Sequence, residues 1–121
     1  MFLSPITVAV GSHILLAASG NGIPSIDVQN TCRVAASAMV RLIGGTTTEN
    51  ALSACLSSEQ GAREQLVKGW STFSASDRNQ CVRPDVYLPS YVEWLTCLEM
   101  ERDVRKMRQQ EAELESKSRR R

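Results

Sequence analysis

The sequence predicts an all-α fold, a small disulfide-linked bundle of three or four helices with an extended C-terminal helix. Ala, Leu, Gln, Glu and Arg are common and runs of β-branched residues are few, which favours helix over sheet. Apolar residues recur every three or four positions along several segments, and the cysteines number four. At 121 residues the chain suffices for one domain, which we place at residues 21–107.

The N-terminal residues 1–20 resemble a secretory signal peptide. They contain no Asp, Glu, Lys or Arg, residues 6–18 are largely apolar, and small residues allow cleavage after Ser19 or Gly20. The usual basic start is missing, so a retained anchor or an ordered apolar arm stays open. A membrane-spanning helix needs about 20 apolar residues, and this run is interrupted, so we expect no stable span once the signal is removed. We expect the protein to be periplasmic or secreted.

All four cysteines follow the predicted cleavage site: Cys32, Cys55, Cys81 and Cys97. An even number of cysteines in an exported chain of this size indicates a disulfide framework. The first two lie almost symmetrically about a turn at Gly44-Gly45, and the last two lie similarly about Pro89. The spacing therefore favours two pairs, Cys32–Cys55 and Cys81–Cys97, each contributing roughly 2–4 kcal/mol to stability.

Two other interpretations of the cysteines stay open, namely buried free thiols and a metal site. Structural zinc usually takes cysteines in close pairs, whereas the successive spacings here are 23, 26 and 16 residues. The sole histidine, His13, lies in the predicted signal peptide. A redox-active CxxC motif is absent too, so the sequence predicts neither a metal nor a cofactor.

N-capping residues indicate where the helices begin. Ser25 can cap a first helix that begins at Ile26. A Ser or Thr followed three residues later by an acid marks three further starts, at Thr46–Glu49, Ser74–Asp77 and Ser90–Glu93. These signals predict helices over residues 26–43, 47–73, 75–82 and from 91 onward, with a linker at 20–25 and an extended connector at 87–89. The inner stripe of the second helix is expected to include Leu52, Cys55 or Leu56, Arg63 and Leu66.

The last helix becomes strongly charged from Glu99 onward, with eight Lys or Arg and six Asp or Glu. Acid–base pairs at helical spacing support an exposed helix, namely Glu101/Arg105, Glu113/Lys117 and Glu115/Arg119. An apolar stripe reaches Met107 but is interrupted at Glu111, short of the three or four heptads that indicate a coiled coil. We expect residues 108–121 to form a charged helix or tail that frays.

The candidate interaction residues are four aromatics and two arginines: Trp70, Phe73, Tyr91, Trp94, Arg105 and Arg108. The aromatics lie at helical spacing, which suits core packing and, alternatively, a ligand pocket or partner groove. No catalytic constellation is recognisable, because cleavage of the signal removes the histidine that Ser–His and Cys–His mechanisms need. We expect a protein that is not an enzyme. The net charge of +1 predicts no nucleic-acid partner.

Several short motifs between residues 30 and 100 resemble a group of known proteins. They are Thr31-Cys32-Arg33, Ser58-Glu59-Gln60, Trp70-Ser71-Thr72-Phe73 and the run from Pro89 to Met100 around Cys97. The pattern is similar to that of small four-cysteine exported proteins of bacteria. The resemblance implies export, and it implies no activity, ligand or catalytic residue.

Together these features predict a non-enzymatic binding, adaptor or envelope-associated protein whose partner is another protein. Its interaction surface is expected within residues 90–115. The alternative is a small carrier of apolar ligands that uses the four aromatic side chains named above. The sequence leaves the oligomeric state open.

Overall fold

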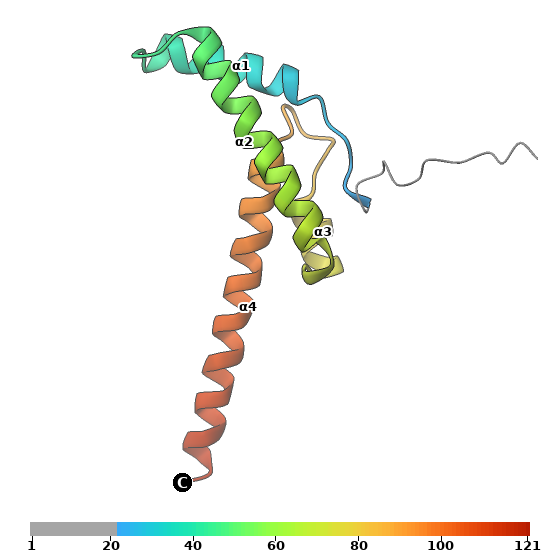
Figure 1. Ribbon diagram of the computed structural model, residues 1–121. Helices are drawn as coiled ribbons and strands as arrows, with labels where there is room; N and C mark the ends of the chain where they lie inside the picture. Colours follow the sequence, from blue (N-terminus) through green and yellow to red (C-terminus); the bar gives the residue numbers. More distant parts are fainter. Residues whose placement is uncertain (1–21) are drawn as a thin grey trace, which may run out of the picture.

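The computed structural model describes residues 22–121 and confirms the all-α fold (Figure 1). Its helices are α1 (Val28–Leu42), α2 (Thr48–Gly69), α3 (Ala75–Cys81) and α4 (Tyr91–Arg119), with a 3-10 turn, η2, at Trp70–Thr72. α2 packs against both α1 and α4, and α3 packs against α4. The predicted signal peptide at residues 1–20 lies outside the described residues.

The starts of α3 and α4 are where their capping residues predicted them. The Ser74 hydroxyl accepts a hydrogen bond from the Asp77 backbone N–H at 3.1 Å, and the Ser90 hydroxyl accepts one from Glu93 at 3.3 Å. Each hydroxyl satisfies one of the N–H groups that a helix start leaves without an internal partner. A Ser followed by an acid three residues later therefore located both helix starts correctly.

The predicted starts of α1 and α2 were wrong by one or two residues. Asp27, not Ser25, caps α1, and its carboxylate accepts from the Asn30 backbone N–H at 3.1 Å. Thr47, not Thr46, caps α2 by accepting from Asn50 at 3.1 Å. Asp caps a helix as well as Ser does, and of two adjacent threonines either can do so, so composition alone did not decide the residue.

The two disulfides join the helices in the pairs that the spacing predicted. Cys32 of α1 bonds Cys55 of α2, with their Cα atoms 5.5 Å apart. Cys81 at the end of α3 bonds Cys97 of α4, with a Cα separation of 5.6 Å. The turn between α1 and α2 contains Gly44 and Gly45 at φ values of 72° and 81°, a conformation that favours glycine. That turn reverses the chain so that the first pair of cysteines meets.

The hydrophobic core lies between α2, α3 and α4, where the aromatic residues concentrate. The buried core residues are Ile23, Ala62, Leu66, Phe73, Cys81, Tyr91, Trp94 and Leu98. The rings of Tyr91 and Trp94 meet edge to face with their centroids 5.4 Å apart. This arrangement is the favoured geometry for an aromatic pair.

Residues 20–25 were predicted to form a linker. The described part of this segment, residues 22–25, packs against the core. Ile23 is only 4% exposed. The Tyr91 hydroxyl donates a hydrogen bond to the Pro24 carbonyl at 3.3 Å and accepts one from the Ile26 backbone N–H at 3.2 Å. Apolar burial and these hydrogen bonds hold a segment whose Gly and Pro content is typical of a loop.

Two further expectations about local structure were right only in part, the inner stripe of α2 being correct at Leu66. The inner face of α2 buries Ala51, Glu59, Ala62 and Leu66, and Leu52, Leu56 and Arg63 are only half-buried. Small alanines let the neighbouring helices approach more closely than the predicted leucines would. The connector before α4 is not extended at Leu88, whose φ is 54°. The Pro89 carbonyl that follows is held by the Thr31 hydroxyl of α1, which donates to it at 2.9 Å.

Helix α4 projects far beyond the rest of the molecule (Figure 1). Its 29 residues span about 43 Å at 1.5 Å per residue. Every residue from Lys106 to Arg121 is exposed, and the helix continues through the predicted boundary at residues 107–108 to Arg119. Within residues 22–121, no helix combines the length and apolar character needed to cross a bilayer.

Candidate functional site

A carboxylate in the middle of α2 accepts hydrogen bonds from the start of α4. Glu59 is 4% exposed and accepts hydrogen bonds from the Ser90 hydroxyl and, at 2.7 Å, from the Tyr91 backbone N–H. The first N–H groups of a helix lack internal partners and carry the positive end of the helix dipole. A buried carboxylate at this point is therefore both hydrogen-bonded and electrostatically matched, and it fixes the direction in which α4 leaves the core.

An ion pair joins α4 to α3 about four turns further along the helix. The guanidinium of Arg105 pairs with the Asp77 carboxylate in the first turn of α3 and lies 3.5 Å from the Ser74 hydroxyl. Asp77 is buried and its side chain is 11% exposed. The sequence predicted that Arg105 would pair with Glu101 of its own helix. Arg105 pairs with Asp77 of α3 instead. The reason is that the buried carboxylate of Asp77 needs a cation beside it.

Two more arginines lie over aromatic rings between these points. Arg78 lies 5.2 Å from the ring centre of Trp70, and Arg102 lies 5.3 Å from that of Phe73. Such cation–π contacts stabilise a partly exposed pair by roughly 0.5–1 kcal/mol. They cover ring surface that solvent would otherwise meet.

The four aromatic candidates are divided between core and core edge. Phe73, Tyr91 and Trp94 are 3–5% exposed and belong to the core, and Trp70 packs against it from the side. Neighbouring side chains already occupy the buried ring faces. An apolar ligand that used these four side chains would have to open the core.

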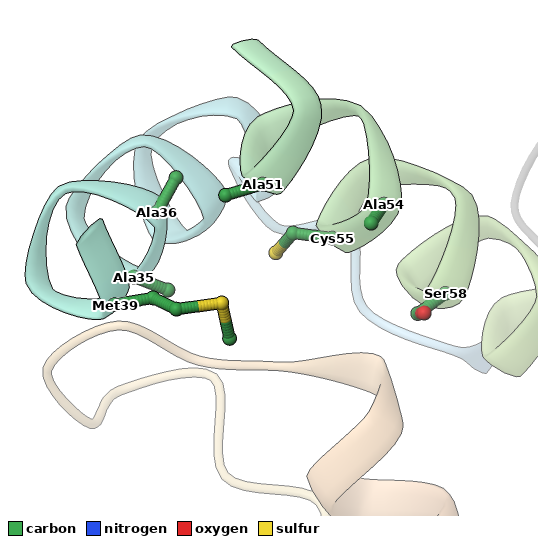
Figure 2. A pocket seen from close by; sticks show the side chains of 7 residues that line it. All are labelled: Ala35, Ala36, Met39, Ala51, Ala54, Cys55 and Ser58. Atoms are coloured by element: carbon green, nitrogen blue, oxygen red, sulfur yellow. The ribbon is translucent and has the colours of Figure 1, made fainter. Parts of the chain in front are cut away.

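A shallow apolar hollow of about 250 Å³ lies between α1 and α2 (Figure 2). It is lined by Ala35, Ala36, Met39, Ala51, Ala54, Cys55 and Ser58. In Figure 2, Ala51 points toward α1, and the Met39 side chain extends beneath the space between the helices. Alanines leave this space beside the Cys32–Cys55 disulfide, and its walls offer almost no polar groups that could orient a ligand.

A second hollow, of about 380 Å³, lies where α4 leaves the core and is lined by three cations, Arg102, Arg105 and Lys106. Arg105 is paired with Asp77, and the Arg102 guanidinium lies 3.9 Å from the Asp103 carboxylate. Two of the three positive charges therefore already have an acid beside them. The hollow is a poor anion site for that reason.

The second half of α4 is exposed at every residue from Lys106 onward. Arg108 lies on it and, unlike Arg105, is exposed. Three apolar side chains on α4 are more than half exposed: Met100 at 62%, Met107 at 56% and Leu114 at 66%. Exposed apolar side chains are unremarkable singly, but a repeated spacing along one helix indicates a face that a partner can cover.

Among the residues that the structure describes, no three His, Cys, Asp or Glu side chains come together in a way that could hold a metal ion. The chain matches no family model, no curated protein and no solved structure closely enough to show a relationship.

Sequence reasoning missed Glu59 as a key residue. It lies within the Ser58-Glu59-Gln60 motif, but an acid in a helix surrounded by Ser and Gln is typical of a solvent-exposed position. Its alignment with Ala51, Ala62 and Leu66 on one helix face is the signal that could have found it.

Proposed function

We propose that this chain is a non-enzymatic binding protein, exported to the periplasm or secreted, that contacts a protein partner through the exposed half of α4. We call residues 106–121 the binding segment. The observation that supports the proposal is that every residue of this segment is exposed while the helix continues through it to Arg119. A helix that packs on nothing gains little stability from tertiary contacts, so a partner that covers one face adds what the single chain lacks.

The base of α4 is built to hold the binding segment in a fixed direction. Glu59 fastens its first turn, the Cys81–Cys97 disulfide its second, and the pair of Arg105 with Asp77 the turn just before the binding segment. A segment presented by a rigid base loses less conformational freedom on binding than a flexible tail does. The proposal therefore moves the interaction surface toward the C-terminus, from the predicted residues 90–115 to residues 106–121.

Cross-linking in the native host tests the proposal. A photo-reactive amino acid at Gln109 or Gln110 of the binding segment should yield a covalent adduct with the partner. The same amino acid at Ser57, which is exposed on α2, is the matched control and should yield none. No adduct from either tail position, or an equal adduct from the control, would contradict the proposal.

The two disulfides indicate an oxidising, extracytoplasmic environment, and they support export as part of the proposal. The intact mass of protein recovered from its host, before and after reduction, tests this part. We expect a chain that begins near Gly20 or Asn21 and gains four hydrogens on reduction. A full-length chain with four free thiols would contradict export.

A further inference from the structure

We propose that the partner of the binding segment is a second copy of the same chain, bound along α4 in the antiparallel direction over residues 99–121. This inference rests on the proposed function, that the exposed half of α4 is a binding surface. It adds the identity of the partner and the direction in which the two helices lie. Three features of α4 carry it: the position of its apolar stripe, the width of that stripe and the order of its charges.

The apolar stripe lies on the face of α4 opposite the core. Residues advance by about 100° along a helix of 3.6 residues per turn. Leu98 belongs to the core, Arg102 lies over the Phe73 ring and Arg105 pairs with Asp77 of α3. These three residues fall within about 60° of one another around the helix axis. Met100 and Met107 fall about 180–200° away from Leu98 by the same geometry. A second helix can therefore lie along the stripe without contacting the core of the chain that it binds.

The stripe has the width of a single helix contact. Met100, Met107 and Leu114 are spaced seven residues apart, which places them on one line along the helix. Val104 flanks the line, and Glu111 interrupts it. A line of this width is the seam of a two-helix contact, whereas packing into a larger bundle needs a broader apolar face. The stripe alone is short, so its charges must supply the specificity.

The charges of α4 alternate in four blocks. Residues 99–103 hold three acids and one arginine. Residues 105–108 hold three cations, of which Arg105 is paired with Asp77, so Lys106 and Arg108 carry the free positive charge of this block. Residues 111–115 then hold three acids, and residues 117–121 hold four cations. The two uncharged residues Gln109 and Gln110 lie between the second and third blocks. Net charge therefore changes sign at every block boundary along the exposed helix.

Among two-fold symmetric pairs, only the antiparallel direction matches these blocks. In a parallel, in-register pair each block meets its own copy, so every contact joins like charges. In an antiparallel pair centred near Gln109 and Gln110, residues 99–103 lie beside 117–121 and residues 105–108 lie beside 111–115, so every contact joins opposite net charges. The same arrangement brings Met107 of each copy to within one or two residues of the level of Leu114 of the other. Complementary flanking charges set partner choice and orientation in paired helices.

A charge-swap experiment tests the inference on the full chain. One variant carries Glu113→Lys and Glu115→Lys, and the other carries Lys106→Glu and Arg108→Glu. All four side chains are exposed, and none contacts the core. In an antiparallel pair of two identical variant chains, residues 105–108 and 111–115 carry net charges of the same sign and repel. In a mixed pair of one chain of each variant, these two blocks again carry opposite net charges at both places where they meet. Glu49→Lys with Glu64→Lys makes the first variant's charge change on α2 and serves as the control.

Sedimentation equilibrium from about 1 μM to about 1 mM gives the readout. At low salt, we expect the average mass of the parent chain and of the control to rise toward twice that of one chain. Each charge variant alone should keep the mass of one chain, and the equimolar mixture should recover the doubling. The association should weaken as salt is raised from about 0.01 M to about 0.15 M, where the Debye length falls from about 30 to about 8 Å.

A parent chain that keeps the mass of one chain at every concentration would overturn the inference. So would variants that associate as the parent does while circular dichroism shows unchanged helicity. The cross-linking test separates this failure from that of the proposed function. An adduct of the Gln109 probe with a different protein keeps the binding segment and rejects the second copy, whereas no adduct rejects both.

Discussion

The carboxylate of Glu59, in the middle of α2, lies 2.7 Å from the backbone nitrogen of Tyr91, the first residue of α4, and accepts its hydrogen bond. The two residues are 32 positions apart in the chain, and both are buried. The contact joins a negative charge to the positive end of the longest helix in the described structure. It also directs α4 away from the core, so the binding segment depends on it for its orientation.

Replacement of Glu59 by Ala should lower the free energy of unfolding by about 2–4 kcal/mol, because it leaves the Ser90 hydroxyl and the Tyr91 N–H buried without their acceptor. Glu59→Gln keeps the shape and one acceptor oxygen, so it should cost less. Urea unfolding with the disulfides intact measures both. Glu64→Ala, at an exposed acid of the same helix, is the matched control. Equal stabilities of the Glu59→Ala and Glu64→Ala variants would show that the contact is not structural.

Removal of the Cys81–Cys97 disulfide by a pair of alanines should cost about 3 kcal/mol and should loosen α3 in particular. α3 has only seven residues, and a helix of that length is not stable without tertiary support. Hydrogen exchange of the α3 amides should therefore accelerate more than that of the α2 amides. The Cys32, Cys55 double alanine variant is the control, since its disulfide joins α1 to α2. Unchanged exchange in α3 would refute the local role of the bond.

The two arginines that the sequence proposed as interaction residues should behave differently. Arg105 pairs with Asp77, so Arg105→Ala and Asp77→Ala should show a coupling energy of about 0.5–1 kcal/mol in a double-mutant cycle. Arg108 is exposed, and Arg108→Ala should leave stability within about 0.5 kcal/mol of the parent. Thermal unfolding of the four proteins measures these differences. A coupling energy of zero would mean that Arg105 does not hold α4 on α3.

Phe73 should act as a core residue and not as part of a ligand pocket. Truncation to Ala should cost about 3–5 kcal/mol, the usual range for a large aromatic in a packed interior. Tyr87→Ala is the aromatic control, because Tyr87 is 85% exposed. Denaturant unfolding compares the two. A Phe73→Ala variant as stable as the Tyr87→Ala variant would revive the ligand-carrier alternative.

What the sequence predicted well depends on contacts between near neighbours or on symmetry about a turn. The capping hydroxyls of Ser74 and Ser90 act three residues away, so local pattern locates them. The disulfide pairs follow from the position of each cysteine relative to a chain reversal. These features require no knowledge of the tertiary fold.

What the sequence did not predict depends on partners distant in the chain. Glu59 looks like a surface acid until Tyr91 is placed beside it, and Arg105 has a plausible partner in Glu101 until α3 brings Asp77 closer. Ile23 stands among Gly, Asn and Pro, and only the folded core shows that it is buried. The exposure of the binding segment is likewise a property of the fold, because an amphipathic or charged pattern does not say which helix ends beyond the core.

Hydrogen exchange of the α4 amides at two protein concentrations tests most directly whether the binding segment binds a second copy of the chain. In dilute solution, we expect slow exchange from Trp94 to Arg105, which the core and α3 support, and fast exchange from Arg108 to Arg119. At high concentration and low salt, exchange in the second region should slow while exchange in the first stays constant. Exchange of residues 108–119 that does not depend on concentration would contradict the account, because the segment would then gain nothing from contact with a second chain.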